Sequence, residues 1–459
     1  MSVFKERRKN NHTFLIGVPI CKNGVKKVTM NITQITKLNT HIIGLLVLMI
    51  AQASHAMVFD NRYIPLLQKP YISIDGRPSH LNANFFATTG SKAIDNKEKV
   101  IGIPELNGEL DIGKMALALQ AVGLPVVLRS DLIGGQPIPV QVDGTIQTQG
   151  LEFSYYQSIR DIIGFGFDWL VMRSNSSQQF RPAKGQTNYV PGIDNSYFDG
   201  VRREMFEELG LNEAHAVQAG MGDLDLYVKL WHYWEYILKM KRIDADARFG
   251  VLVPAGVTTQ VNSPASIPFG GNGHWGVYAE LDAEFELKED IKAGIFFRFS
   301  KRFKKTQFNR LPVASDPLAK PPVAGQPQIY AVAVGDVTIN PGFNFVFSPY
   351  VTLENLRAGL GVRVLYTYTK HLRDNWCNAA PCSTKNDMVP TIDLSLVNEF
   401  SEWKTDYVSL SVFYDFGKTK VQQSLDPILI FNWDIPSLLF GSERAVNSHK
   451  VSLGLEVNF

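Results

Sequence analysis

Three stretches of the sequence alternate charged and apolar residues with a period of two. They are RIDADARFGVLV (242–253), HWGVYAELDAEFELK (274–288) and KAGIFFRFSKRFK (292–304). Charged side chains at this spacing can pair across a sheet, set the ion preference of a pore, or transfer protons. The candidate functional residues are Glu280, Asp282, Glu284, Arg298, Arg302, Asp244, Asp246 and Arg248.

Proton transfer in catalysis is the least favoured of these roles. General acid–base catalysis needs a carboxyl whose pKa is raised in a dry site, but these acids stand beside bases. A nucleophilic serine of the barrel-phospholipase type would need a histidine two residues before it on the same strand face. No histidine after position 56 has this spacing; they are His80, His215, His232, His274, His371 and His449. We therefore expect no enzymatic activity.

The alternation predicts β-strands with one apolar and one polar face. The apolar Leu281 and Ile295 would face lipid, while the acids and bases would face an enclosed lumen. A charged side chain on the lipid face costs about 2–4 kcal/mol at the bilayer midplane, which favours this assignment. A three-residue turn between the two strands would place Asp282 opposite Arg298, a pairing that contributes about 0.2–1 kcal/mol.

Similar strands occur in pairs along the chain. Short polar turns join the two strands of a pair, and long connections rich in Pro, Gly, Asn and Ser separate the pairs. This rhythm is typical of outer-membrane barrels, which have short periplasmic turns and long outer loops. The predicted strands are 80–89, 145–157, 162–174, 222–236, 242–253, 274–288, 292–304, 342–353, 357–370, 391–400, 405–417 and 451–459.

The predicted fold class is therefore all-β, a transmembrane antiparallel up-and-down barrel of about 12 strands. Barrels of this kind close with an even number of strands, so a further strand at 427–440 with a partner would give about 14. The last strand, VSLGLEVNF, carries Leu453 on its apolar face and ends in Phe459. A soluble barrel with aromatic packing is the alternative.

The N-terminal region predicts export. The apolar run 42–50 follows Lys37 and precedes two small-residue sites that end at Ala53 and Ala56, as in a secretory signal peptide. The run is shorter than the roughly 20 residues of a membrane-spanning helix. We expect a leader and signal peptide over 1–56, a periplasmic segment over 57–79 and the barrel over 80–459. Met30 is the expected true start, and a genuine long leader from Met1 is the alternative.

Composition limits the partners. Cys377 and Cys382 remain after cleavage, and an oxidising compartment favours a loop disulfide between them. Only His371 lies near this pair, so we expect no metal site. Lys and Arg total 46 against 44 Asp and Glu, which gives no basic excess for nucleic acid. The expected partners are outer-membrane lipid, the barrel assembly machinery and a small solute, with no cofactor.

Two long loops predict helices. Residues 112–123 have apolar side chains at helical spacing, and Gly123 would end that helix. In the next loop, Asp199 can cap a helix that Gly210 ends. Its apolar face would pack among the outer loops or fold into the barrel mouth. That face consists of Val201, Met205, Phe206 and Leu209.

One hairpin supports a family resemblance. The stretch GDLDLYVKLWHYWEYILKMKRIDADARFGVLVPAG (222–256) resembles a hairpin of outer-membrane channels associated with phenol-degradation pathways, which look distantly like long-chain fatty-acid channels. The matched positions are Gly222, Asp223, Leu224, Lys229, Trp231, Gly250, Pro254 and Gly256. The resemblance implies a membrane barrel. Phe459 also resembles the terminal signal that the barrel assembly machinery reads.

Two functions are compatible with these patterns. The first is a passive outer-membrane channel of a diderm bacterium, with the eight charged residues lining the pore. The second is a surface-exposed structural or adhesin-like barrel, in which the same charges form a salt-bridged plug. Wide aqueous pores belong to barrels of 16–18 strands, and side chains can largely fill the interior of a barrel of about 12, so both functions remain open at this point.

Overall fold

The computed structural model describes most of the chain after residue 53. Only residues 54–55 of the predicted leader and signal peptide (1–56) are described, and the helix predicted at 112–123 and Cys382 lie outside the described residues. All described residues belong to one compact unit, Ala51–Phe459. They are 54–55, 58–68, 71–72, 79–93, 109–111, 139–160, 162–182, 200, 202–204, 206–207, 210–235, 240–311, 333–378, 394–418, 426–437 and 439–459.

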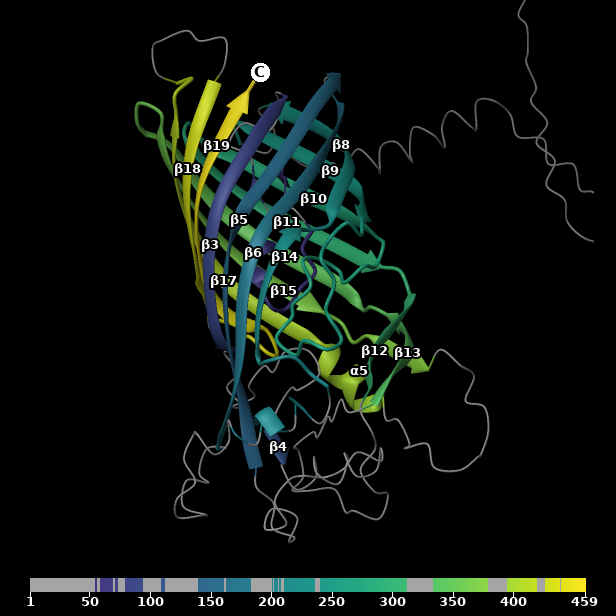
Figure 1. The fold of residues 1–459 in the computed structure, drawn as a ribbon. Helices are drawn as coiled ribbons and strands as arrows, with labels where there is room; N and C mark the ends of the chain where they lie inside the picture. Colours follow the sequence, from purple (N-terminus) through teal and green to yellow (C-terminus); the bar gives the residue numbers. More distant parts are fainter. Residues whose placement is uncertain are drawn as a thin grey trace, which may run out of the picture. The chain divides into compact units, whose positions relative to one another are not determined.

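Twelve antiparallel strands close into a barrel (Figure 1). The barrel closes where the last strand pairs with the first, with Leu453 opposite Phe85. In order around the barrel, the strands are β3 (His80–Ala93), β5 (Pro139–Arg160), β6 (Ile163–Pro182), β8 (Leu224–Glu235), β9 (Arg242–Val253), β10 (Gly276–Lys288), β11 (Ile291–Arg302), β14 (Phe343–Arg357), β15 (Leu360–His371), β17 (Trp403–Asp415), β18 (Asp426–Pro436) and β19 (Val446–Asn458). The predicted all-β barrel of 12 strands is confirmed.

The two ends of the barrel differ. The turn end holds Phe459 and the short turns of β5–β6, β10–β11 and β14–β15, and the loop end holds the long connections. At the loop end β12 (Lys305–Leu311), β13 (Ala333–Asn340) and β16 (Asn375–Asn378) form a separate three-stranded sheet. The remaining elements are β1 (Ser54–His55), which pairs with β2 (Tyr71–Ile72); β4 (Glu109–Asp111), which pairs with β5; β7 (His215–Met221), which pairs with β6; the 3-10 helix η1 (Pro65–Gln68); and the helix α5 (Ser395–Ser401).

The outer wall of the barrel is apolar. Leu453 is 52 % exposed and Ile295 38 % exposed, while their strand neighbours Ser452 and Phe296 are buried on the inner side. Leu281 is also partly exposed, as the sequence pattern predicted. Aromatic side chains continue this surface, for example Phe299 against Phe345. No helix in the described part of the chain is long and apolar enough to span a membrane.

One predicted strand is wrong, and the stretch proposed as a possible extra strand replaces it. The described part of the predicted strand 391–400, residues 394–400, adds no strand to the barrel, because α5 occupies Ser395–Ser401. The stretch 427–440 instead contributes β18, whose Ile428 and Ile430 point inward and whose Phe431 and Trp433 point outward. The count of twelve is therefore right although one of its members differs.

The predicted register of β10 and β11 is wrong by two residues. Glu280 stands opposite Arg298, and Asp282 stands opposite Phe296. The turn is shorter than expected because only two residues lie between the paired Lys288 and Ile291, and the register shifts between Glu286 and Lys288. Asp290 in this turn has φ 67°, a left-handed conformation that short polar residues tolerate.

The helix predicted before Gly210 is present in its described residues. Positions 200, 202–204 and 206–207 are helical. Gly210 adopts φ +62°, and the backbone N–H of Leu211 donates to the carbonyl of Phe206 at 2.7 Å. This is the left-handed glycine ending that the sequence predicted. Phe206 is buried, while Val201, Met205 and Leu209 lie outside the described residues, as does Asp199.

Candidate functional site

All eight candidate residues lie on the inner face of the barrel. None of them is more than 6 % exposed, and each shares the inward parity of its strand. The strands β9, β10 and β11 are neighbours, so their inward side chains form one continuous charged wall. Burial also shows that other side chains fill the lumen beside this wall.

Arg248 is the centre of the charged wall. Its guanidinium pairs with Asp168, with Asp225 at 2.7 Å, and through Nε with Glu280 at 3.7 Å. The guanidinium carbon also lies 3.5 Å from the centroid of the Tyr227 ring, which is a cation–π contact. Three carboxylates thus share one base in a site with almost no solvent exposure.

Glu280 connects this centre to the next strand. Its Oε1 accepts a hydrogen bond from Arg298 Nε at 2.6 Å, so the carboxylate bridges two arginines. Sequence reasoning missed one member of the network, Asp168, because it is the only charge in the apolar β6 stretch 162–172. Its inward parity on an adjacent strand was the one signal that could have identified it.

Four acids form a block on the inner face nearer the turn end. Asp282 stands opposite Asp246, and Glu284 stands opposite Asp244. Like charges directly opposite each other on a sheet are destabilising, so nearby bases are needed. Lys229 pairs with Asp246 at 3.3 Å, Lys292 with Glu284 at 3.2 Å, and Arg242 with Asp244.

Asp282 differs from the other three acids of this block. Its Oδ1 accepts a hydrogen bond from the Tyr350 hydroxyl at 3.2 Å. Its carboxylate forms no ion pair with any described residue of the chain, although it is 1 % exposed. A buried carboxylate held only by a phenol is the least compensated charge of the wall.

An N-terminal segment, residues 58–68, lies inside the barrel near the loop end. Asp60 accepts hydrogen bonds from Asn344 Nδ2 at 2.6 Å and from Ser300 Oγ at 3.0 Å, and its Oδ2 pairs with Arg302 Nε at 3.1 Å. Arg302 in turn binds Asp223 at 2.6 Å. These described residues of the segment expected to be periplasmic therefore occupy the lumen.

The electrostatics of this anchor favour an ionised carboxylate. Burial raises the pKa of Asp60, but the Arg302 charge and the hydrogen bonds from Asn344 and Ser300 outweigh it and leave the pKa below its usual value. The anchor therefore holds a carboxylate against a guanidinium across the lumen.

Apolar contacts hold the other side of the N-terminal segment. Phe59, Ile64 and Leu67 are buried in one cluster with inward residues of β3, β5 and β6 and with the loop between β9 and β10. Asn61 Nδ2 also donates to the carbonyl of Pro268 in that loop at 2.7 Å. The other members of this cluster include Phe86, Ile146, Leu170, Met172, Ile267 and Phe269. The segment and this loop together close part of the lumen.

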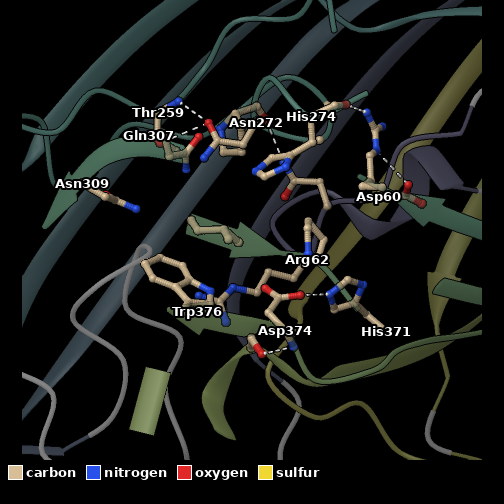
Figure 2. A pocket seen from close by; sticks show the side chains of 18 of the residues that line it. Asp60, Arg62, Thr259, Asn272, His274, Gln307, Asn309, His371, Asp374 and Trp376 are labelled. Atoms are coloured by element: carbon tan, nitrogen blue, oxygen red, sulfur yellow. Dashed lines mark hydrogen bonds and ion pairs between the residues drawn. The ribbon is translucent and has the colours of Figure 1, made fainter. Parts of the chain in front are cut away.

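A cavity of about 190 Å³ lies beside the N-terminal segment (Figure 2). Polar and aromatic side chains line it, including Asp60, Arg62 and Trp376. His371 Nε2 and Asp374 Oδ1 are 2.8 Å apart, and the His371 ring stacks on Trp403 with centroids 5.7 Å apart. A small solute with polar groups would find both hydrogen-bonding and stacking partners there.

Asp374 is held as a carboxylate in this cavity. Burial raises its pKa, but His371, the backbone N–H of Gly342 and the charge of Arg62 together bring the pKa below its usual value. Its own backbone N–H donates to Ser401 Oγ at 2.7 Å, which ties the start of β16 to α5.

The remaining sequence predictions concern cysteine and metal. Cys377 lies exposed on β16, and Cys382 is outside the described residues, so the disulfide stays a prediction. No group of three or more His, Cys, Asp or Glu side chains in the described ranges has the arrangement of a metal site.

Comparisons with known proteins give structural matches alone. No family model and no curated protein matches the sequence. The chain is similar to a crystal structure of an outer-membrane channel from Pseudomonas putida F1, at 9 % identity and a TM-score of 0.44, over 83 % of this chain and 96 % of that one. It is also similar to a Pseudomonas aeruginosa FadL homologue, at 9 % identity and a TM-score of 0.30, over 89 % and 99 % of the two chains.

A third match is the toluene transporter TbuX of Ralstonia pickettii. The identity is 9 % and the TM-score 0.34, over 84 % of this chain and 90 % of that one. The chain itself is a closed antiparallel β-barrel with an apolar outer face.

Proposed function

We propose that this protein is a passive outer-membrane channel for small polar solutes, closed in the present conformation by the N-terminal segment. The observation that carries the proposal is a closed barrel with an apolar outer face and a charged inner face. Leu453 and Ile295 are exposed on the outside, while Arg248 and Glu280 are buried on the inside. The proposal assigns no catalytic reaction to the chain.

The cost of burying charge supports a channel. Taking ions out of water costs several kcal/mol per ion, and well-packed apolar residues often replace a buried ion pair without loss of stability. An interior built for stability alone would therefore gain little from Arg248 and its three carboxylate partners. A charged wall is expected where water and polar solutes contact the lumen in at least one conformation.

The N-terminal segment is suited to act as a removable closure. Asp60 makes several of its polar contacts with the wall, and the carbonyl of Arg62 accepts a hydrogen bond from the backbone N–H of Val446 on β19 at 3.0 Å. The segment's apolar side chains are buried among inward residues of the barrel. If cleavage follows Ala53 or Ala56, the two sites that the sequence predicts, the segment begins at the fifth or the second residue of the mature chain. A chain end can leave the lumen without breaking any pair of barrel strands.

A second candidate function rests on the packing of the lumen. The eight charged residues are at least 94 % buried, and most of them are ion-paired to neighbouring strands. A surface-exposed structural or adhesin-like barrel would need just such a filled interior, and its outer loops would do the binding. This candidate predicts that no solute passes in any state.

Conductance separates the two candidates. Purified protein is inserted into planar bilayers, and single-channel currents are recorded for the wild type and for Asp60→Ala, which removes the anchor of the N-terminal segment. The channel proposal predicts discrete openings that become more frequent in Asp60→Ala. Asp60→Asn, which keeps the side-chain volume, is the matched control and is expected to show an intermediate effect. Silence in all three proteins would support the plugged barrel.

A further inference from the structure

We infer that the open lumen prefers cations over anions, because its inner wall carries a large excess of carboxylates. The inference rests on the proposed channel function and names the class of solute. Of the buried ionisable side chains on the inner face of the twelve strands, leaving histidine aside, eleven are acidic and six are basic. The acids are Asp168, Asp225, Asp244, Asp246, Glu280, Asp282, Glu284, Glu354, Asp415, Asp434 and Glu456, and the bases are Lys229, Arg248, Arg298, Arg302, Arg363 and Lys450.

Half-buried side chains do not change this difference. Glu152 and Glu286 add two acids to the inner face, and Arg242 and Lys292 add two bases. At the loop end, Asp60 and Asp223 add two further carboxylates around Arg302. The predicted leader over 1–56 carries eight Lys and Arg and one Glu, so the rest of the chain has 38 bases and 43 acids. The inner wall alone accounts for a carboxylate excess of this size.

Several bases of the inner wall each pair with more than one carboxylate, so ion pairing does not neutralise all of the carboxylates. Arg248 pairs with three carboxylates, and Lys292 pairs with Glu284 at 3.2 Å and with Glu354 at 2.7 Å. Arg302 likewise serves both Asp60 and Asp223. Glu280 also pairs with Arg298, and Glu354 also pairs with Lys418, so carboxylates outnumber bases locally at Arg248 and at Arg302 but not at Lys292.

Several buried carboxylate oxygens of the inner wall lack hydrogen-bond donors among the described residues, for example one on Asp168 and one on Asp246. Oδ1 of Asp168 and Oδ1 of Asp246 accept no hydrogen bond from any described residue, and both side chains are 1 % exposed and on the inward parity of their strands. Together with Asp282, which forms no ion pair among the described residues, they are acceptors that a passing cation with its water can use.

Four carboxylates, three of them ion-paired, form the block of Asp244, Asp246, Asp282 and Glu284. Cross-strand pairing places four carboxylates next to one another on β9 and β10. A low-dielectric wall focuses the field of such a block into the lumen and raises the local concentration of counter-ions. Rings of Asp and Glu set cation preference in pores by this mechanism.

The test is the reversal potential in a KCl gradient. Currents through Asp60→Ala are recorded with a tenfold difference in KCl across the bilayer, and the ratio of K⁺ to Cl⁻ permeability is obtained from the zero-current voltage. We expect a ratio several-fold above one. Asp282→Asn, introduced into the same background, removes a charge without breaking any ion pair of the described residues and is expected to lower the ratio.

Two further variants complete the design. Arg363→Gln removes an inner base and is expected to raise the ratio, whereas Glu289→Gln changes an exposed acid in the β10–β11 turn and is expected to leave it unchanged. A zero-current voltage on the anion side, or a ratio near one that Asp282→Asn does not alter, overturns the cation preference and leaves the channel proposal intact. Absence of any current in Asp60→Ala contradicts the channel proposal, and the cation preference falls with it.

Discussion

Glu280 on β10 and Arg298 on β11 stand directly opposite each other, and Arg298 Nε donates to Glu280 Oε1 at 2.6 Å. Because Glu280 also contacts Arg248, this one pair joins the networks of three strands. The inner wall is therefore one connected set of charges, and changes at one member are transmitted to the others.

Replacing Arg248 with methionine should destabilise the barrel strongly. The variant leaves Asp168, Asp225 and Glu280 without their shared base, and removing one partner of a buried ion pair costs about 3–5 kcal/mol. Urea unfolding of the protein in detergent micelles measures the loss. Arg373→Met is the control, because Arg373 is exposed in the connection after β15, outside the barrel strands, and should change stability by no more than about 0.5 kcal/mol. Equal losses in the two variants would show that Arg248 is not the centre of the wall.

Cysteine pairs should report the register of β10 and β11. Ala283 stands opposite Ile295, so the double variant Ala283→Cys/Ile295→Cys is expected to form a disulfide under mild oxidation. The alternative pair Ala283→Cys/Phe297→Cys corresponds to the register predicted from the sequence and should cross-link poorly, because diagonal neighbours are about 7–8 Å apart. Gel mobility with and without reductant reads the result in a Cys377→Ser background. Preferential linkage of the second pair would mean that the register is shifted by two residues.

Acid should not release the N-terminal segment until the pH is well below 4. The pKa of Asp60 is lowered in the folded protein, so its contribution to anchoring is complete above the ordinary value of 3.8 and is lost only as pH falls through the lowered value. Open probability is expected to stay constant from pH 7 to pH 4 and to rise below that. In Asp60→Asn this rise should be absent. A rise centred near pH 6 in the wild type would assign the anchor to a different group.

An arginine on the outer wall should be costly only within the bilayer. Leu453→Arg places a charge on the exposed face of β19, and about 2–4 kcal/mol of stability should be lost if this position lies near the bilayer midplane. Leu439→Arg is the matched control, since Leu439 is more exposed but lies in the connection between β18 and β19. Unfolding from lipid vesicles distinguishes them. A water-soluble barrel would show no cost for either variant.

The barrel could be predicted from the sequence because alternate residues of each strand face two different environments, the lipid outside and the polar lumen inside. Leu281 and Ile295 on one face and Asp282 and Arg298 on the other are explained by lipid outside and charge inside. The alternation of short turns and long connections gave the number of strands. That number is correct even though β18, and not the predicted strand at 391–400, is the twelfth strand. The sequence could not show that this stretch forms a helix, because the spacing of Leu396, Val397 and Phe400 is compatible with both a strand and a short helix.

The positions of individual charges were harder to predict. The register of β10 and β11 depends on the single turn between them. The turn has one residue fewer than predicted and a bulge lies beside it, so Arg298 stands opposite Glu280 and not opposite Asp282. The N-terminal segment gave no signal, since Asp60 and its neighbours have no periodicity and bind residues more than 200 positions away. These contacts form only once the barrel has closed, so the residues around Asp60 in the sequence do not reveal them.

The most direct test of the account is the single-channel current of Asp60→Ala compared with the wild type in planar bilayers. A channel closed by the N-terminal segment should open rarely in the wild type and frequently in Asp60→Ala. The conductance of each opening should be the same, because the same charged wall lines the lumen in both proteins. A variant that folds with the wild-type unfolding midpoint and still passes no current would contradict this account.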